Sequence, residues 1–278
     1  MGTNDASKEA WASGDPYESY VGRWSRRVAR GFIRWLDIPE ESDWLDVGCG
    51  TGSLGQTILE MSNPRKIKGV DRSEAFVEFV QARVRDPRAE FQVANAQALP
   101  MEPDAFDAVV SGLVLNFVPH PERMIAEMVR VARQDKIVAL YVWDYAGKMQ
   151  MMRHFWNAAT ALDPSARDLD EGRRFPICNP DSLSRLFEQA GLLHVEVRPI
   201  DISTDFMSFD DYWFPFLGGQ GLAPGYVMSL SKERRARLRE RIYNSLPFAL
   251  DGSIPLVARA WAVRGVKETK NRSKRRMP

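Results

Sequence analysis

Short apolar runs alternate with segments of helical periodicity from residue 44 onward, and this alternation restricts the chain to few folds. Strands joined by crossover helices form right-handed βαβ units, which build a parallel sheet covered on both faces. Two further alternating runs near the carboxyl terminus extend that sheet. The pattern predicts a doubly wound α/β fold with seven strands, mostly parallel, at residues 44–47, 66–70, 89–93, 105–111, 136–143, 194–200 and 256–264.

The composition is that of an ordinary globular protein, with 44% apolar and 27% charged residues among 278. A formal net charge of +1 means that no global field favours nucleic acid or an anionic membrane. The longest mainly apolar run, residues 108–118, is far shorter than the ~20 residues of a membrane span. Two cysteines cannot form a disulfide framework, and the first residues lack an apolar signal region. We therefore expect a cytoplasmic protein without a membrane span.

A glycine-rich loop follows the first predicted strand, where the sequence reads Asp-Val-Gly-Cys-Gly-Thr-Gly at 46–52. Glycines at 48, 50 and 52 allow a sharp turn and the close approach of a ligand. The free N–H groups at the following helix start favour anionic or electron-rich ligand groups. Asp71 ends the second strand, and a carboxylate there can accept both hydroxyls of a ribose. The alternative for Asp71 alone is an ordinary strand-end carboxylate facing water.

Two kinds of nucleoside cofactor fit this pattern. Residues 50–55 formally match GxGxxG, the dinucleotide fingerprint of nicotinamide-dependent oxidoreductases, but that pattern alone is weak. Asp46 favours the other kind, because its carboxylate can order the loop and meet a cationic amino-acid tail, whereas it would repel a pyrophosphate. The nicotinamide-dependent oxidoreductase stays open as an alternative.

Four segments together resemble the class I S-adenosylmethionine (SAM)-dependent methyltransferases, in the small-molecule branch similar to the ubiquinone/menaquinone biosynthesis methyltransferases. They are WLDVGCGTG at 44–52, GVDRS at 69–73, ANAQALP at 94–100 and FDAVVSGLVLNFV at 106–118. The resemblance covers roughly residues 15–200. It implies a Rossmann-like fold, SAM as cofactor, and transfer of a methyl group to a small-molecule acceptor by in-line displacement. A non-catalytic SAM-binding protein is a further alternative.

The resemblance also implies which residues bind the cofactor. Asp71 would bind the ribose hydroxyls, Asn95 and Ala96 would meet the adenine, and Tyr20 would lie over SAM as a lid. Family members usually carry Gly-Asp at 94–95; Asn95 in this chain keeps an acceptor for the adenine amine but has no charge. The predicted cofactor-binding residues are Tyr20, Asp46, Gly48, Gly50, Gly52, Asp71, Arg72, Asn95, Ala96 and Ser111.

The regions around the core are predicted to cap or cover it, since long insertions in compact domains are usually functional lids. We expect, in chain order, an N-terminal helical cap (1–43), the SAM-binding core (44–145), a lid insertion (146–178), a continuation of the core (179–200), an aromatic lid insertion (201–254), the last core strand (255–265) and a basic disordered tail (266–278).

The sequence gives fewer indications of the acceptor site than of the cofactor site. Asn116 is polar within an apolar run, and a buried polar group needs a partner. Aromatic side chains of the insertions could form an apolar pocket, or could pack a small helical subdomain on itself. The predicted substrate-binding residues are Asn116, Trp143, His154, Tyr212 and Trp213.

No residue is assigned as catalytic, because SAM carries an activated methyl group and a base is needed only if the acceptor arrives protonated. His154, Asp144 and Tyr145 are candidates for such a base. No metal is expected. The arginine-rich run at 234–241 reads as a solvated helix face, so a nucleic-acid substrate is not favoured. The oligomeric state is not predicted.

Overall fold

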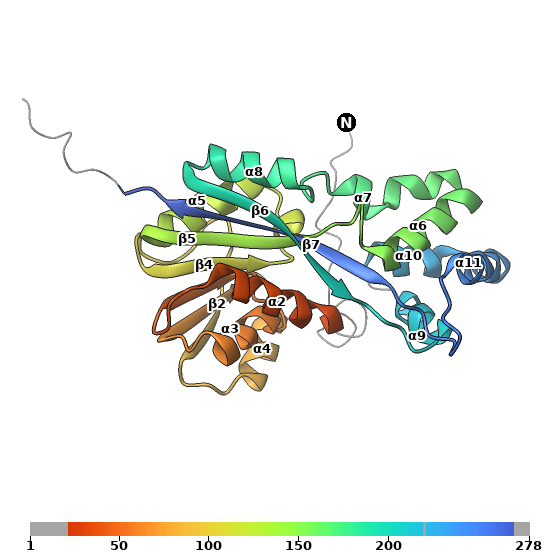
Figure 1. Cartoon of the computed structure of the whole chain (residues 1–278), viewed down its shortest axis with the longest axis horizontal. Coiled ribbons are helices and arrows are strands. Elements are labelled where there is room, and N and C mark those ends of the chain that lie inside the picture. Colours follow the sequence, from red (N-terminus) through yellow and green to blue (C-terminus); the bar gives the residue numbers. More distant parts are fainter. Residues whose placement is uncertain (1–21, 219–220, 270–278) are drawn as a thin grey trace, which may run out of the picture. The chain divides into compact units, whose positions relative to one another are not determined.

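The computed structural model describes residues 22–218 and 221–269, and shows a seven-stranded sheet with flanking helices (Figure 1). The strand order is β3-β2-β1-β4-β5-β7-β6. The predicted fold class, a mostly parallel, doubly wound sheet, is confirmed. The strands are β1 (Asp43–Val47), β2 (Lys66–Asp71), β3 (Ala89–Val93), β4 (Phe106–Gly112), β5 (Ala132–Trp143), β6 (Leu192–Ser203) and β7 (Val257–Lys267).

Strands β1 to β5 pair in parallel, and their register aligns their carboxyl ends. Val47 at the end of β1 lies opposite Val70, and Asp71 at the end of β2 lies opposite Val93. After β3 the chain crosses to the other side of β1 to form β4, so the strand order reverses beside β1. Ligands of open α/β sheets bind at such a switch point, outside the carboxyl ends of the strands.

The α-helices of the described residues are α2 (Arg23–Leu36), α3 (Ser53–Met61), α4 (Glu74–Arg83), α5 (Pro121–Val131), α6 (Gln150–Leu162), α7 (Glu171–Arg174), α8 (Pro180–Gln189), α9 (Phe209–Trp213), α10 (Leu222–Ser229) and α11 (Lys232–Ser245). Three short 3-10 helices are η3 (Leu115–Phe117), η4 (Pro164–Leu169) and η5 (Phe214–Leu217).

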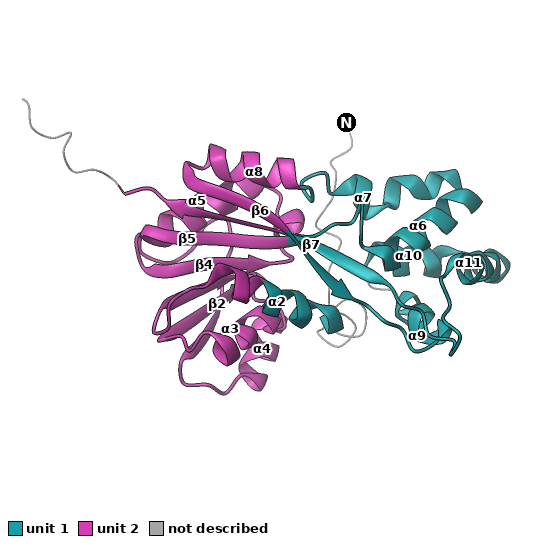
Figure 2. Cartoon of the chain, viewed as in Figure 1, with its two compact units in different colours: residues 1–31, 142–179, 199–261 teal, residues 32–141, 180–198, 262–278 magenta. Residues whose placement is uncertain are grey.

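The chain divides into two compact units (Figure 2). Unit 2 comprises residues 32–141, 180–198 and 262–278 and contains the glycine loop; unit 1 comprises residues 1–31, 142–179 and 199–261. The end of β6 and the beginning of β7 belong to unit 1, and the rest of both strands belongs to unit 2. These neighbouring strands therefore run in opposite directions, which makes β7 the antiparallel strand.

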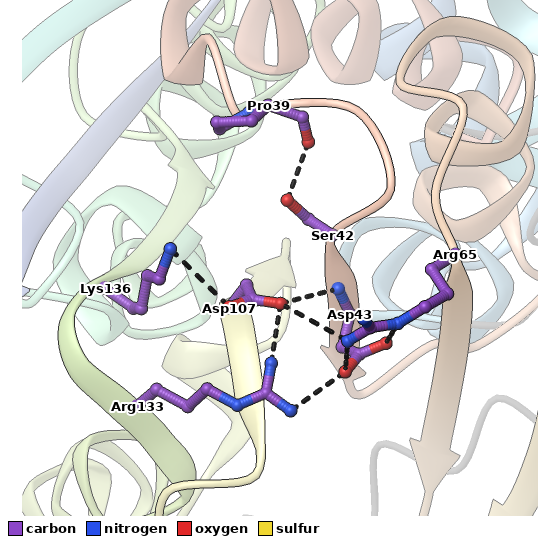
Figure 3. A network of polar contacts seen from close by, with 7 residues as sticks. All are labelled: Pro39, Ser42, Asp43, Arg65, Asp107, Arg133 and Lys136. Atoms are coloured by element: carbon purple, nitrogen blue, oxygen red, sulfur yellow. Dashed lines mark hydrogen bonds and ion pairs between the residues drawn. The ribbon is translucent and has the colours of Figure 1, made fainter.

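A network of charged side chains ties β1, β4 and β5 together at their amino ends, opposite the glycine loop (Figure 3). Arg133 donates to Asp43 at 2.9 Å and to Asp107 at 2.6 Å, and Arg65 pairs with Asp43 from the start of β2. The hydrogen bond from Arg65 lowers the pKa of Asp43 despite partial burial. The network stabilises the sheet and belongs to its architecture.

Unit 1 has an aromatic core formed by its helices. Phe155 of α6 stacks on Phe216 of η5 with ring centroids 4.5 Å apart, and lies edge-on to Trp156 at 4.9 Å. The hydroxyl of Tyr212 donates to the carbonyl oxygen of Met151 at 2.7 Å, which ties α9 to α6. The predicted insertions thus fold into helices, and their function as lids stays a prediction.

Several predicted strand boundaries differ from the structure by a few residues, and two of these differences have a clear structural reason. Strand β5 begins at Ala132 rather than at residue 136, because Ala132 already pairs with Phe106 and the bulge between Phe106 and Ala108 takes up the irregularity. The predicted disordered tail starts too early: β7 continues to Lys267, whose ammonium donates to Asp104 and to the carbonyl of Ala132, both at 2.7 Å. Residues 270–278 of the tail lie outside the described residues.

Candidate functional site

The glycine loop joins β1 to α3 at the switch point of unit 2. Its glycines adopt positive φ values of 79° at Gly48, 47° at Gly50 and 87° at Gly52, a region that favours residues without a Cβ. The backbone N–H of Gly48 donates to the carbonyl of Val70 at 2.7 Å, which anchors the loop to β2. The backbone conformation by itself is therefore sufficient reason for glycine at these three positions.

The three glycines differ in what lies around them. A Cβ at Gly48 would lie 2.5 Å from a methyl carbon of Val114, and one at Gly52 would lie 2.5 Å from a methyl carbon of Val80. A Cβ at Gly50 would meet no atom within 4 Å. Gly50 thus borders open space, whereas Gly48 and Gly52 are covered by neighbouring side chains.

Asp71 connects the end of β2 to this loop. One carboxylate oxygen accepts a hydrogen bond from the N–H of Gly50 at 3.0 Å, and the other accepts from the N–H of Ser73 at 2.9 Å. Burial raises the pKa of Asp71, while these two amides and the charge of the exposed Arg72 oppose the rise. Each oxygen keeps a further lone pair, so the carboxylate can still accept ligand hydroxyls.

Asp46 lies inside the domain rather than in the loop's open space. Its side chain is completely buried, and neither oxygen has a hydrogen-bond partner of normal geometry, although the amide of Gly55 faces the carboxyl. Burial and the nearby charge of Asp71 raise the pKa of Asp46 to about 7. A substantial fraction of Asp46 is therefore protonated at neutral pH, and its repulsion of a pyrophosphate is weaker than the sequence suggested.

The segment after β4 forms the other side of the loop. Ser111 is buried and donates to the carbonyl oxygen of Val47 at 2.6 Å, which fixes the ends of β1 and β4 together. Leu113 has a φ of +64°, and such strain in a non-glycine residue is often found at functional sites. Asn116 is half-buried, and its amide nitrogen is buried without a hydrogen-bond partner. This donor is available for a ligand.

Asn95 and Ala96 follow β3 at the same edge of the sheet. Asn95 is exposed, and its side-chain oxygen accepts from the backbone N–H of Gln97 at 2.9 Å. The N–H of Ala94 donates to the carbonyl oxygen of Asp71 at 2.9 Å, which holds this segment beside the end of β2. Unit 2 therefore brings eight of the predicted cofactor residues to one edge of its sheet, with Asp46 buried beneath them.

The other predicted substrate residues lie in unit 1. Trp143 is 2% exposed with its indole nitrogen unpartnered, and Tyr212 and Trp213 are buried in the aromatic core. His154 is half-buried with Nδ1 3.3 Å from the hydroxyl of Ser245, and burial lowers its pKa. The packing of Tyr212 and Trp213 matches the self-packed subdomain considered above. Tyr20 lies outside the described residues.

Sequence reasoning missed the part played by Val114. Its side chain occupies the space that a Cβ at Gly48 would need, although 66 positions along the chain separate the two residues. An apolar residue within an apolar run gives no signal of such a contact. Among the described residues, no cluster of three or more His, Cys, Asp or Glu could hold a metal ion.

Comparisons with known proteins agree with this geometry. Residues 45–140 match the family described as "Methyltransferase domain". The phthiotriol/phenolphthiotriol dimycocerosates methyltransferase of Mycobacterium tuberculosis is 32% identical over 122 residues, which are 44% of this chain and 43% of that protein. The demethylmenaquinone methyltransferase of Bacillus subtilis is 28% identical over 188 residues, covering 59% of this chain and 76% of that protein.

A solved structure shows the same fold. Phosphoethanolamine N-methyltransferase 2 of Haemonchus contortus, in complex with phosphomonomethylethanolamine and S-adenosylhomocysteine, superposes with a TM-score of 0.56 at 15% identity, over 87% of this chain and 53% of that one. The chain spans less than half the length of the curated relatives it matches first. In the part of the chain described here, no helix is both long and apolar enough to cross a membrane. Residues 45–140 therefore match the methyltransferase domain family, and the described part of the chain has the Rossmann-like fold seen in solved structures of methyltransferases.

Proposed function

We propose that the protein is a SAM-dependent methyltransferase that transfers a methyl group to a small-molecule acceptor. One observation carries the proposal furthest: the amide of Gly50, which borders open space, is tied to the carboxylate of Asp71 at the switch point of the methyltransferase domain. A glycine loop beside a carboxylate with free lone pairs supports the binding of a nucleoside at this point.

The residues of unit 2 fit SAM. Gly48, Gly50 and Gly52 would line its methionine and ribose portions, and Asp71 would accept the ribose hydroxyls beside Arg72. Asn95 and Ala96 would meet the adenine. Ser111 would act indirectly, since its hydroxyl already donates to Val47. We assign Tyr20 the role of a lid.

Asp46 would support the site from beneath. Its carboxyl is buried without a normal partner, and its pKa near neutrality lets it hold or release a proton when a cationic amino-acid group binds above it. Solved structures of this fold contain SAM or S-adenosylhomocysteine, which supports the same cofactor here. Nothing in the described residues favours the nicotinamide-dependent oxidoreductase or a non-catalytic SAM-binding protein.

When bound, SAM supplies an activated methyl group on a sulfonium. The chain's residues then have to orient the acceptor in line with that group and exclude water. The unpartnered amide of Asn116 can donate a hydrogen bond to the acceptor or to the cofactor. His154, whose pKa is lowered by burial, is the candidate base for an acceptor that arrives protonated.

The acceptor is proposed to be a small molecule because the relatives are named for such acceptors, phthiotriol dimycocerosates and demethylmenaquinone. Asn116, Trp143, His154, Tyr212 and Trp213 remain the proposed acceptor residues. For Trp143, Tyr212 and Trp213, which are buried, we expect a role in shaping a wall through packing. We also propose a cytoplasmic location.

Replacing Asp71 tests the proposal. Asp71→Ala removes the ribose acceptor and the link to Gly50, so the Kd for SAM measured by calorimetry should rise at least about tenfold, the weight of one to two charge-assisted hydrogen bonds. Glu78→Gln on the exposed face of α4 removes a carboxylate elsewhere in the same unit and should leave the Kd unchanged. Equal affinities of the Asp71→Ala variant and the wild type would refute this placement of the ribose.

A further inference from the structure

The surface of unit 1 contains a groove between the end of α6 and helix α11, and none of the residues proposed above to bind SAM or the acceptor lines it. Two adjoining cavities form it, and they share Leu162 and Arg237. The larger one is open and has a volume of about 460 Å³, within the range of small-molecule sites. The groove is lined by Leu162, Asp163, Tyr226, Leu230, Arg234, Arg237, Leu238, Glu240, Arg241, Asn244 and Ser245.

Three arginines follow one another along this groove. Arg234, Arg237 and Arg241 are spaced three and four residues apart, so they lie on one face of α11. That face adjoins the buried side of the helix, which carries Leu238 and Ile242, and Leu238 borders the groove as well. The arrangement concentrates positive charge along one side of a groove.

Two of these guanidinium groups have no ion-pair or hydrogen-bond partner among the described residues, namely Arg237 and Arg241. Arg234 has only a long contact of 3.9 Å to Asp163, whose carboxylate accepts from the N–H and hydroxyl of Ser165. Other arginines of α11 are engaged: Arg235 donates to backbone carbonyls, and Arg239 pairs with Asp210. The two arginines of the helix without a partner among the described residues therefore both line the groove.

The opposite part of the groove is apolar. Leu162, Leu230 and Leu238 line it together with the ring of Tyr226, which packs edge-on against Phe155 at 6.4 Å. The negatively charged residues that line the groove are Asp163 and Glu240. Asn244 and Ser245 add neutral polar groups at the far end, where Ser245 contacts the half-buried His154.

We propose that this groove binds a phosphate group attached to an apolar chain. A guanidinium group binds phosphate oxygens with paired hydrogen bonds. Two neighbouring arginines can both bind one phosphate, because it has three oxygens, whereas a single arginine already binds both oxygens of a carboxylate. The leucines would cover the first carbons of the attached chain. The phosphate could come from a soluble alkyl phosphate or from a lipid headgroup, and the groove recognises what these share.

Calorimetric titration tests the proposal with three probes: inorganic phosphate, hexyl phosphate, and vesicles of phosphatidylcholine with or without phosphatidylglycerol. Hexyl phosphate should bind at least about fivefold more tightly than inorganic phosphate, because only the former reaches the leucines. Binding to the vesicles that contain phosphatidylglycerol, with no binding to phosphatidylcholine alone, would identify the lipid source; binding of hexyl phosphate alone would identify the soluble source.

Variants locate the binding. Arg237→Gln and Arg241→Gln should each raise the Kd for hexyl phosphate about three- to tenfold, as expected for partly exposed charge-assisted contacts. Leu162→Ala should reduce the preference for hexyl phosphate over inorganic phosphate. Arg123→Gln, an equal loss of charge on an exposed residue of α5, should change neither value.

The Kd for SAM serves as a separate readout and should be the same in all these variants, which distinguishes a failure of this proposal from a failure of the proposed function. Absence of binding by every probe would overturn the assignment. Binding that is equal in the wild type, Arg237→Gln and Arg241→Gln would overturn it as well.

Discussion

Asp46 links the stability of unit 2 to pH. A carboxyl whose pKa rises from 3.8 in the unfolded chain to about 7 in the fold favours folding only while it is protonated. Its contribution is fully present below pH 3.8 and is lost as the pH rises through 7. The free energy of unfolding therefore falls by about 4 kcal/mol at most between these two pH values, since each unit of pKa is worth about 1.4 kcal/mol.

We therefore predict that Asp46→Asn stabilises the protein at high pH relative to the wild type. In urea unfolding without cofactor, the stability of the variant relative to the wild type should increase by about 2–3 kcal/mol from pH 5 to pH 8, because the wild type loses the rest of this contribution in that window. Glu78→Gln should follow the wild type at both values. A wild type and an Asp46→Asn variant with the same pH dependence would show that Asp46 is not the titrating group.

Single residues show what the sequence could and could not reveal. Asn116 was predicted to need a partner because it interrupts an apolar run, and its buried amide nitrogen has no hydrogen-bond partner among the described residues. The bond between Gly50 and Asp71 could not be predicted, because it joins residues 21 positions apart through a turn geometry that only the folded loop defines. The burial of Asp46 was not predicted either, although its apolar neighbours Leu45 and Val47 indicated a buried strand.

Within the loop between β1 and α3, two glycines of similar conformation should respond differently to substitution. Gly50→Ala meets no atom and should cost only the left-handed backbone strain, about 1–2 kcal/mol. Gly48→Ala adds the overlap with Val114 and should cost roughly 1–3 kcal/mol more.

Adding Val114→Ala removes that overlap. It should recover part of the loss in Gly48→Ala and none of the loss in Gly50→Ala, as measured by urea unfolding of both double variants. Equal effects of Val114→Ala in the two backgrounds would contradict the contact between Gly48 and Val114.

The helices of unit 1 make a second prediction at the level of elements. If Tyr212 joins α9 to α6, Tyr212→Phe should lower the free energy of unfolding by about 1 kcal/mol, because the carbonyl of Met151 loses its donor. Tyr243→Phe, which alters a 48% exposed ring, should change it by less than about 0.5 kcal/mol. Thermal and urea unfolding of both variants would decide this, and an unaffected Tyr212→Phe would argue against the bond.

Strands built from local patterns were predicted to within a few residues, as for the strand at 89–93. Of the helices in the insertions, the one in the arginine-rich run was predicted, and α11 confirms it; how these helices pack was not predicted. Phe155 and Phe216 stack on each other although 61 residues separate them, so the packing that orders these segments is non-local. The free charges of α11 were likewise hidden, because the sequence does not show which arginines are paired.

At the scale of the whole molecule, the two units contain the residues of different proposed sites. Unit 2 contains the family match and the glycine loop tied to Asp71, which together predict the cofactor. Unit 1 contains an aromatic core, which includes proposed acceptor residues, and an arginine-lined groove, which is proposed to bind a separate ligand. The identity of the cofactor is therefore the claim on which the proposed function depends.

Calorimetric titration of the purified full chain with SAM, S-adenosylhomocysteine and NAD in parallel tests that claim most directly. We predict binding of SAM and S-adenosylhomocysteine with Kd values in the micromolar range, roughly −8 kcal/mol, and no binding of NAD. Binding of NAD without binding of SAM would contradict the proposed function and leave the fold as the part of the account that stands.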